Sequence, residues 1–488
     1  MPSALKDLQS VTACPVSNRP AKTPSSITVG NFCPFPEIRM PSWLTTNSRR
    51  SSDVAMENTP PSRREFLKSS SALLAGTALS APNILRGASP DAKLKIGFIG
   101  CGGRGTGAAN QALKANPNNI LWAVGDAFED KLTSSLEGLK QNHTAQVDVP
   151  ESRQFVGLDA YQKVIDSGVD VVLLTTPPAF RPIHFKAAVA AGKHCFLEKP
   201  MATDSPGLRS VIETVAEAKK KHLGVCAGFC WRYHPGMRET FKRLADGAIG
   251  TLLANYNTYN TGAVDRYPKW NRKNTPRDLE WQMRRWYYFT WSGGDSIVEQ
   301  ACHSIDKMSW ALGDTPPIKC VGHGGRQVRT GEDYGNIFDH FSIVYDYPNN
   351  VRGFHASRQI NLTAAANTDS FYGSAGTCEI NGSIKQFVIK DLKGKVTWRH
   401  TPEKSDMYQV EHDEFFASIR SGNPINDGDR MATSTMLSIM GRMAAYTGQE
   451  ITWEMAMDSK EKLVPEHFDW DMKLPVPPVA LPGITPFA

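Results

Sequence analysis

A glycine pattern near residue 100 constrains the fold more than any other feature of the chain. Gly100, Gly102 and Gly105 are spaced as G-x-G-x-x-G, directly after an apolar, β-branched run at 94–99. The residues from 106 to 115 have a helical composition. Strand, glycine turn and helix in this order typically bind a dinucleotide, because the glycines allow a tight turn and the helix N-terminus faces the pyrophosphate. The sequence therefore predicts an α/β chain that begins with a Rossmann domain.

The end of the next predicted strand favours NAD over NADP. An apolar run at 120–124 leads to Asp126. A carboxylate at this place accepts hydrogen bonds from the ribose hydroxyls and repels a 2′-phosphate, so NADP is the less favoured cofactor. The alternative is that Asp126 caps the following helix. Gly103 and Arg104 complete the predicted cofactor loop, with Arg104 either near the pyrophosphate or in solvent.

Two further strands are predicted, at 169–175 and at 192–200. The first is apolar nearly throughout, which fits a strand buried on both faces of a parallel sheet. Ligands of such sheets bind at the carboxyl ends of the strands, so the residues there are expected to face the cofactor. These residues are Thr176, Pro177, His184 on the following helix, Glu198 and Lys199.

In combination, these motifs resemble the Gfo/Idh/MocA oxidoreductases over residues 93 to about 454. The glycine loop, Asp126, the Thr-Pro-Pro segment with its following histidine, and Glu-Lys-Pro carry the resemblance. It implies that Lys199 is the catalytic lysine, that Glu198 lies beside the nicotinamide, and that the bond before Pro200 can be cis. It also implies a second, α+β domain with a large open, mainly antiparallel sheet. Members of the family often pair through this sheet, so a homodimer or tetramer is expected.

The residues after 227 agree with such a second domain, because frequent turn signals divide them into short strands. The predicted strands lie at about 250–260, 318–328, 337–347, 351–360, 369–373, 376–381, 385–390 and 394–399. The predicted boundaries are 93–227 for the Rossmann domain, 228–454 for the substrate and oligomerisation domain, and 455–488 for a C-terminal extension.

A second group of reactive side chains lies near residue 300. One helix is predicted to place Glu299 and His303 four residues apart, on one face. A carboxylate and an imidazole so placed can bracket a substrate hydroxyl, and the carboxylate can raise the imidazole pKa. Sugar dehydrogenases of the resembled family normally have Asp where Glu299 stands. A satisfied core histidine is the alternative for His303, and Asp306 is expected to fix the helix.

Arginine and aromatic residues suggest a polyhydroxylated substrate. Aromatic faces pack against sugar C–H surfaces, and arginines clamp hydroxyls or carboxylates. Arg232, Arg284 and Trp286 are therefore the predicted substrate residues. A buried aromatic cluster under a long loop explains the segment around Arg284 and Trp286 equally well.

The composition argues against nucleic acid as a partner and gives no reason to expect a metal. The chain has 55 basic and 49 acidic residues, a formal charge of +6, but ten of the basic and six of the acidic residues lie in 1–92, so the remainder carries +2. Seven cysteines lie beyond residue 92, an odd number without a disulfide framework, so free thiols are expected. Cys226 and Cys230 have no second pair at zinc spacing, which favours small buried residues over ligands.

An export leader is predicted before the glycine loop. Arg63 and Arg64 are followed by Phe-Leu-Lys and by a weakly apolar run at 69–81, which is too short for the about 20 residues of a membrane span. The pattern resembles the twin-arginine class, whose substrates fold before export, so the Tat machinery is an expected partner and the periplasm the expected location. A chance basic pair is the alternative. Residues 56–92 are the predicted leader and linker, with cleavage between 78 and 92, and residues 1–55 are disordered or precede a true start at Met56.

These features together predict an exported NAD-dependent oxidoreductase acting on a sugar, sugar derivative or polyol. Lys199 is expected to shuttle the hydroxyl proton with its pKa lowered by the nicotinamide ring, while Glu299 and His303 orient the substrate. Without an external NAD pool, the cofactor is expected to be held tightly and restored in each cycle. One alternative is an NAD-dependent glycosidase that oxidises, eliminates, adds water and re-reduces, although the Tyr-Pro-Thr-His segment of one such group is absent. Another is a non-catalytic ligand-binding homologue, which the intact Glu-Lys-Pro disfavours.

Overall fold

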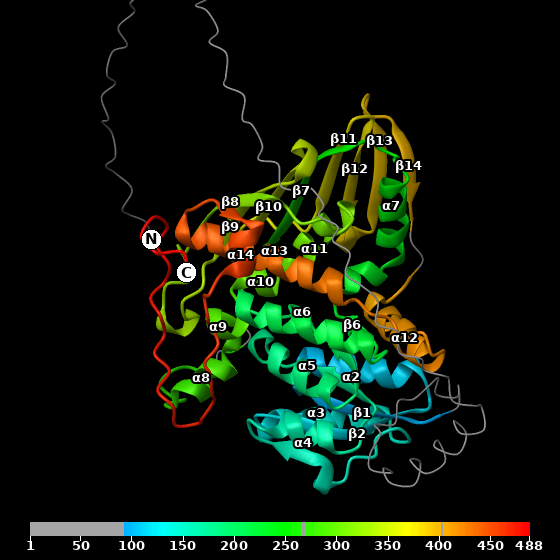
Figure 1. The fold of residues 1–488 in the computed structure, drawn as a ribbon, viewed down its shortest axis with the longest axis vertical. Helices are drawn as coiled ribbons and strands as arrows, with labels where there is room; N and C mark the ends of the chain where they lie inside the picture. Colours follow the sequence, from blue (N-terminus) through cyan, green and yellow to red (C-terminus); the bar gives the residue numbers. More distant parts are fainter. Residues whose placement is uncertain (1–91, 265–266, 268, 402–403) are drawn as a thin grey trace, which may run out of the picture. The chain divides into compact units, whose positions relative to one another are not determined.

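The computed structural model describes residues 92–264, 267, 269–401 and 404–488 of the chain. The predicted leader, the stretch before it and nearly all of the predicted cleavage window lie outside the described residues. Two β-sheets organise the described part, one of six strands and one of nine (Figure 1). No helix in these ranges is both long enough and apolar enough to cross a membrane.

The first sheet is parallel and has the strand order β3-β2-β1-β4-β5-β6. Its central strands are buried on both faces, which is why their sequences are nearly continuous apolar runs. The strands are β1 (Leu94–Ile99), β2 (Asn119–Asp126), β3 (Gln154–Val156), β4 (Val171–Leu174), β5 (His194–Leu197) and β6 (Val225–Ala227).

Helices cover both faces of this sheet, as in a Rossmann fold. The apolar sides of α4, α5 and α6 form one core with the sheet, and those of α2 and α3 form another. Helix α12, from much later in the chain, packs beside α2 in this second core. The helices are α2 (Gly103–Ala115), α3 (Glu129–Asn142), α4 (Ala160–Asp166), α5 (Arg181–Ala190), α6 (Ser205–Lys220) and α12 (Met407–Arg420).

The second sheet has the order β14-β13-β12-β11-β7-β10-β9-β8-β15 and is antiparallel except for the central pair β7–β10. This large, mainly antiparallel sheet is the one that the sequence predicts. Its strands are β7 (Leu252–Thr261), β8 (Lys319–Gly325), β9 (His340–Asp346), β10 (Arg352–Gln359), β11 (Asp369–Gly373), β12 (Gly376–Asn381), β13 (Gln386–Asp391), β14 (Val396–His400) and β15 (Ile451–Thr452).

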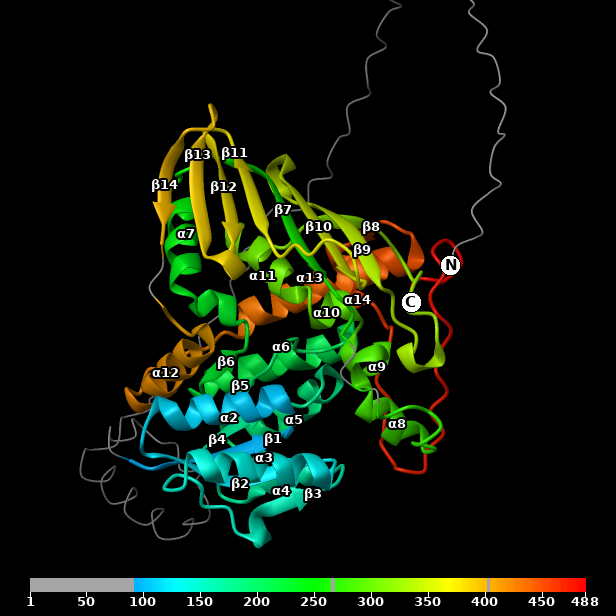
Figure 2. The ribbon, with the colours of Figure 1, turned by 180° about the vertical axis from the view of Figure 1, so that it is seen from behind.

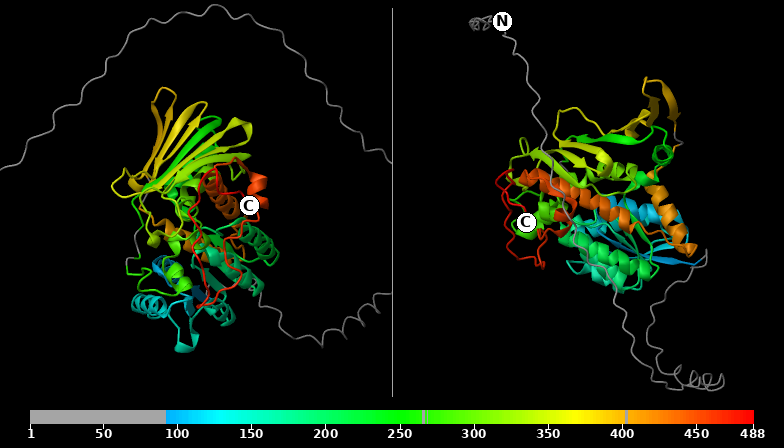
Figure 3. Two further views of the ribbon diagram at one scale, coloured as in Figure 1. Left: turned by 90° about the vertical axis from the view of Figure 1, so that its left-hand side faces the viewer. Right: turned by 45° about the horizontal axis from the view of Figure 1, so that its top comes forward.

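Helices of the described residues cover one face of this sheet, and Figure 3 shows the other face open. Side chains alternate accordingly, so that every second residue of β10 is buried. On the open face Tyr256, Val321, Phe354 and Tyr372 are 38 to 45% exposed. The remaining helices are α7 (Pro235–Ala245), α8 (Asp278–Arg284), α9 (Thr290–Gly293), α10 (Ser296–Glu299), α11 (Cys302–Ala311), α13 (Gly428–Thr447) and α14 (Trp453–Asp458).

The C-terminal segment passes along α9 and α8, where it meets the Rossmann fold, and then turns back to end beside Thr447 and Ser459 of the second half (Figure 2). Its aromatic residues contact the nucleotide-binding half directly: the ring of Phe468 lies 5.0 Å from Phe180, and that of Trp470 lies 5.6 Å from Phe128. The segment around Trp281 belongs to the same apolar cluster. Through these contacts the C-terminal segment links the second half of the chain to the first.

The strands predicted from sequence are present, with ends shifted by a few residues at most sites. The short strands β3, β6 and β15 have two or three residues each and were not predicted. The seven cysteines of the described residues are buried free thiols, as expected for the cysteines beyond residue 92.

Candidate active site

The glycine loop forms a cradle with open space on one side. Gly100 has φ +99°, and a Cβ there would lie 2.6 Å from the backbone nitrogen of Thr176. A Cβ on Gly105 would lie 2.1 Å from the carbonyl oxygen of Gly100. Gly102 and Gly103 have no atom within 4 Å of such a position. The first and last glycines are therefore required for close packing, while the middle ones leave room at the N-terminus of α2 for a phosphate group.

Asp126 lies at the end of β2, beside this loop. Its Oδ2 accepts a hydrogen bond of 2.6 Å from the backbone N–H of Cys101, and its Oδ1 accepts one of 2.9 Å from Phe128. Burial raises the pKa of this carboxyl, although both N–H groups oppose the shift. Phe128, not Asp126, is the N-cap of α3. The residues present thus fit a dinucleotide, with the loop at the pyrophosphate and a carboxylate near the ribose.

The residues after β4 close one side of the crevice. Thr176 Oγ1 lies 3.3 Å from His184 Nδ1, and the His184 ring stacks on Tyr161 with centroids 4.2 Å apart. Burial, assisted by the charge of Arg181, lowers the pKa of His184 to about 3, so the ring is neutral. Pro177 precedes the short turn that leads into α5.

Glu198 and Lys199 follow β5 and point to different partners. Glu198 Oε1 accepts a 2.5 Å hydrogen bond from Arg104 Nε, so the arginine of the glycine loop is paired and not free in solvent. Lys199 is joined to Pro200 by a cis bond, as the resemblance implies. The two neighbouring side chains thus carry one ion pair each.

Lys199 pairs with Glu299, 100 residues away in the sequence. Its Nζ lies 3.0 Å from Glu299 Oε1 and also donates to the Glu299 backbone carbonyl. Both side chains are about 10% exposed. Glu299 Oε2 is buried and has no hydrogen-bond partner among the described residues. One oxygen of the carboxylate therefore holds the lysine, while the other is left for a further donor.

The single helix predicted around residue 300 is interrupted, which explains this contact. α10 ends at Glu299 and α11 begins at Cys302. The N–H of His303 donates to Gln300 instead of Glu299. The Glu299 carbonyl oxygen therefore does not accept the helical hydrogen bond from His303 and accepts one from the Lys199 ammonium group instead.

The lowering of the Lys199 pKa by the nicotinamide ring stays a prediction, and the protein surroundings alone act in the opposite direction. Burial is the largest single influence and lowers it, but the charge and hydrogen bond of Glu299, together with smaller contributions of neighbouring groups, raise the pKa of Lys199 above its ordinary value. In the described residues, without a nicotinamide charge, Lys199 is a charged hydrogen-bond donor and not a free base.

The expected rise of the His303 pKa is wrong. Burial, followed by the positive charges of Lys199 and Lys307, lowers the pKa of His303 well below its ordinary value. Its Nδ1 has no hydrogen-bond partner among the described residues, and its ring meets Phe229 edge-on at 6.3 Å. A neutral imidazole with a free nitrogen can accept a proton from a substrate hydroxyl.

Two of the three predicted substrate residues are engaged elsewhere. Arg232 is buried and binds Asp306 and Asp314, with Nη2 2.8 Å from Asp306 Oδ1. This contact confirms that Asp306 fixes its helix, but it leaves Arg232 no free hydrogen-bonding edge for a ligand. Arg284 binds Glu280 and reaches across to Asp130 on α3, 3.1 Å away.

Trp286 belongs to the aromatic cluster that packs under the C-terminal segment. Its ring meets that of Tyr287 edge-on at 5.7 Å. The core interpretation of this segment therefore describes the structure, and Trp286 remains a substrate residue only as a prediction.

Two residues near the site were not singled out in the sequence. Tyr259, on β7, donates a 2.8 Å hydrogen bond to Gln300, next to Glu299. Burial raises the pKa of Tyr259 to about 12, although the charge of Lys199 opposes the shift. The only sequence signal was its place on a predicted strand. Glu411, which contacts Arg104, gave no signal at all.

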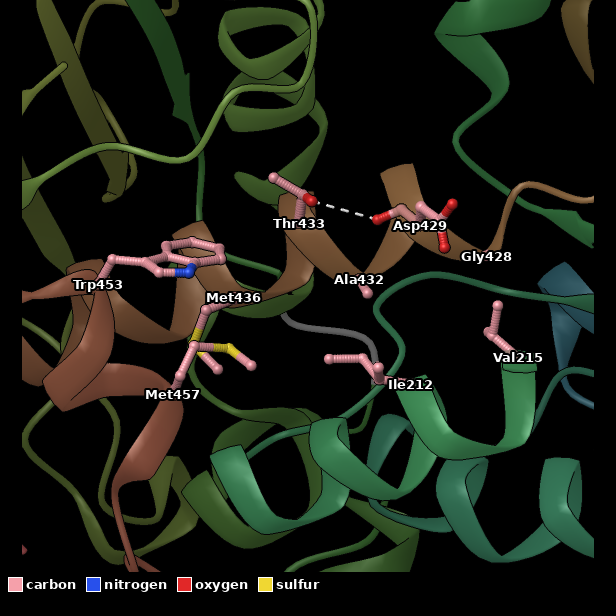
Figure 4. Close-up of a pocket in the computed structure, with 9 residues that line it drawn as sticks. All are labelled: Ile212, Val215, Gly428, Asp429, Ala432, Thr433, Met436, Trp453 and Met457. Carbon is pink, nitrogen blue, oxygen red and sulfur yellow. Dashed lines mark hydrogen bonds between the residues drawn. The ribbon is translucent and has the colours of Figure 1, made fainter. Parts of the chain in front are cut away.

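A separate hollow of about 200 Å³ lies between α6, α13 and α14 (Figure 4). Its lining is mainly apolar and includes Ile212, Ala432, Met436, Trp453 and Met457. None of the predicted site residues lines it, so it is distinct from the cofactor crevice.

Comparison with known proteins agrees with this geometry. Residues 94–227 match the model of an oxidoreductase family with an NAD-binding Rossmann fold. Inositol 2-dehydrogenase of Paracoccus denitrificans (strain Pd 1222) is 34% identical over 222 residues, which are 45% of this chain and 55% of that protein. Trans-1,2-dihydrobenzene-1,2-diol dehydrogenase of Sus scrofa is 24% identical over 260 residues, 51% and 68% of the two chains. The chain thus spans about half the length of most of the relatives it matches.

Among solved structures, an aldose-aldose oxidoreductase from Caulobacter crescentus, complexed with glycerol, is similar to 74% of this chain and 99% of its own length. The TM-score is 0.57 at 18% identity. At this identity the likeness shows that the two proteins share a fold across both halves.

Proposed function

We propose that this chain, which belongs to the Gfo/Idh/MocA oxidoreductase family by its NAD-binding domain, oxidises a secondary hydroxyl group of a sugar or polyol by hydride transfer to bound NAD. One observation carries the proposal. Lys199, Glu299 and His303 come together from two halves of the chain at the carboxyl ends of the parallel strands, next to the glycine loop.

The three side chains divide the work on the substrate hydroxyl. When bound, NAD supplies the hydride acceptor. The charged Lys199 donates to the hydroxyl oxygen and stabilises the negative charge that develops as its proton leaves. The free Nδ1 of His303 accepts that proton, and Glu299 holds Lys199 in place and in its charged form. The substrate C–H bond breaks with its electron pair leaving as hydride, and a carbonyl forms.

The substrate class is supported by the site and by the relatives. The site suits a ligand with several hydroxyl groups, because it offers the charged donor of Lys199, the unpartnered carboxylate oxygen of Glu299 and the neutral imidazole of His303. The relatives named above are dehydrogenases of an inositol and of a dihydrodiol. The test is a panel of inositols and aldoses, assayed by mass spectrometry of products. Ketone or lactone products from the wild type, and a loss of at least about 100-fold in Lys199→Ala, support the proposal. Glycosidic cleavage without net oxidation would favour the glycosidase alternative.

The cofactor is proposed to be exported with the folded protein and retained through turnover. The twin-arginine pattern at 62–68 supports export, and the absence of NAD outside the cytoplasm makes retention necessary. Purified native protein is denatured and the released nucleotide identified by mass spectrometry. Stoichiometric NAD after dialysis is the expected result, and a protein stripped by dialysis contradicts it. Cell fractionation tests the periplasmic location.

The open face of the nine-stranded sheet is proposed to pair with a second copy of the chain. Tyr256, Phe354 and Tyr372 are large and exposed on three neighbouring strands, which is unusual for a surface that stays in water. Sedimentation of the wild type should give a dimer or tetramer. Phe354→Asp should dissociate it, and a wild-type monomer would contradict the proposal.

A further inference from the structure

A buried carboxyl of the second half of the chain contacts the arginine of the cofactor loop. Glu411, on α12, is fully buried, and its Oε1 lies 3.4 Å from Arg104 Nη2. Its Oε2 has no hydrogen-bond partner among the described residues. Burial, together with the charge of Glu198, raises the pKa of Glu411 well above its ordinary value. Because an apolar side chain of this size would be less costly to bury, stability alone does not explain the carboxyl.

The Arg104 guanidinium is held on several sides. Its Nε donates to Glu198 at 2.5 Å and its Nη1 to Gln111 at 2.9 Å. The ring of Tyr408, also on α12, lies 4.5 Å from its centre. Nη1 lies 3.2 Å from the position of a Cβ on Gly107, so the group extends along α2. Arg104 stands in the first turn of α2, within the glycine loop, so these contacts hold that turn in place.

Helix α12 reaches the same part of α2 by a third residue. Gln409 Nε2 donates a 3.0 Å hydrogen bond to the backbone carbonyl of Gln111. Figures 1 and 2 both show α12 beside α2. One helix of the second half thus presents a carboxyl, an aromatic ring and an amide to the helix that begins at the cofactor loop.

We propose that Glu411 and Tyr408 act as positioning residues that set how long the dinucleotide stays bound, by holding Arg104 and hence the glycine loop in its binding conformation. A preformed loop loses less conformational freedom when the cofactor binds, and such gains are expressed mainly in slower dissociation. The proposal rests on the proposed function only in requiring a dinucleotide at the loop. It supplies a structural basis for retention of the cofactor.

The test compares Glu411→Met with Glu414→Met. Glu414 lies on the same helix, but its side chain pairs with Arg238 on α7 at 2.6 Å, and in the described residues its ion pair and side-chain hydrogen bonds go to that arginine and not to α2. Each protein is loaded with NADH and mixed with excess NAD⁺, and the loss of bound NADH fluorescence gives the dissociation rate. We expect about tenfold faster dissociation from Glu411→Met, because an acceptor for a charged donor is lost. Glu414→Met should match the wild type, and Glu411→Gln, which keeps the acceptor, should restore slow dissociation.

Wild-type dissociation from a folded Glu411→Met protein would overturn the proposal, as would equal acceleration in Glu414→Met. If Glu411→Met does not fold, Tyr408→Leu tests the second contact with the same expected acceleration and the same contrary outcome. These rates require no substrate. A chain that turns over no sugar but shows the expected rates would therefore refute the proposed function and leave this inference intact.

Discussion

Replacing Glu299 by Gln tests the role of the Lys199–Glu299 pair. The side chain keeps its size and an oxygen that can accept from Lys199, but it loses its charge. Unit charges 3.0 Å apart, in surroundings with an effective dielectric constant near 20, attract each other by about 5 kcal/mol. Because both side chains are about 10% exposed, little of this is screened by solvent.

The expected effect appears in the pH dependence. In the wild type, burial lowers the pKa of Lys199, but the charge and hydrogen bond of Glu299, together with smaller contributions of neighbouring groups, raise it above its ordinary value, so Lys199 keeps its proton throughout the assay range. In Glu299→Gln burial remains and the main opposing charge is gone, so the pKa falls below its ordinary value. The protonated fraction is then lost as the pH rises. We expect kcat to fall about 100-fold and kcat/KM to decline at alkaline pH where the wild type stays level.

Steady-state kinetics between pH 6 and about pH 10 with saturating NAD measures both effects. Glu414→Gln is the control, because it also removes a paired carboxylate, on a helix away from Lys199. A Glu299→Gln profile with the wild-type shape and a rate within threefold would refute the argument that the carboxylate keeps Lys199 charged. The same decline in Glu414→Gln would show that alkaline unfolding is its cause.

Three further substitutions test other parts of the site. Arg232→Met leaves two acidic partners unpaired, so the free energy of unfolding should fall by about 3–5 kcal/mol; calorimetry measures it, and an unchanged melting temperature contradicts the role in folding. Asp126→Ser should narrow the preference for NAD over NADP, seen in the ratio of their dissociation constants, and an unaltered ratio would mean that Asp126 does not contact the ribose. Gly105→Ala places a Cβ 2.1 Å from the Gly100 carbonyl, so NAD affinity should fall more than about tenfold. Wild-type affinity in titrations would show that the loop adapts.

The fold was predictable because its signals are local. The apolar runs that become β1 and β4, and the glycines between strand and helix, indicate a buried parallel sheet without reference to the rest of the chain. The antiparallel strands were equally predictable, because turn residues separate them in the sequence. Strand β15 was not predicted, because two residues are too few to show the alternation of buried and exposed side chains that indicates a strand.

The electrostatics of the site depended on contacts that no local pattern encodes. The partner of Lys199 is 100 residues away, and the contact arises because a helix ends at Glu299. The sequence predicted Arg232 as a substrate residue, but in the structure it binds the carboxylate of Asp306, 74 positions later in the chain. Glu411 lies 307 positions from Arg104. The residue types therefore indicated which side chains are candidates for the site, but the protonation states of these side chains depend on contacts that only the tertiary structure shows.

The ion pairs of the site suggest a test of whether the cofactor stays bound through turnover. Arg104 is paired with Glu198 and Lys199 with Glu299, which leaves the neutral His303 as the proposed acceptor of the substrate proton. Oxidation of an alcohol by NAD⁺ yields a carbonyl, NADH and a proton. If the same NADH then reduces a second carbonyl, that proton is consumed again. A cycle on a retained cofactor therefore releases no net proton, whereas release of NADH gives one proton per product. With a polyol substrate whose product is a ketone, which does not hydrolyse to an acid, we expect a pH dye in weak buffer to report no net release, and stoichiometric acidification would refute the closed cycle.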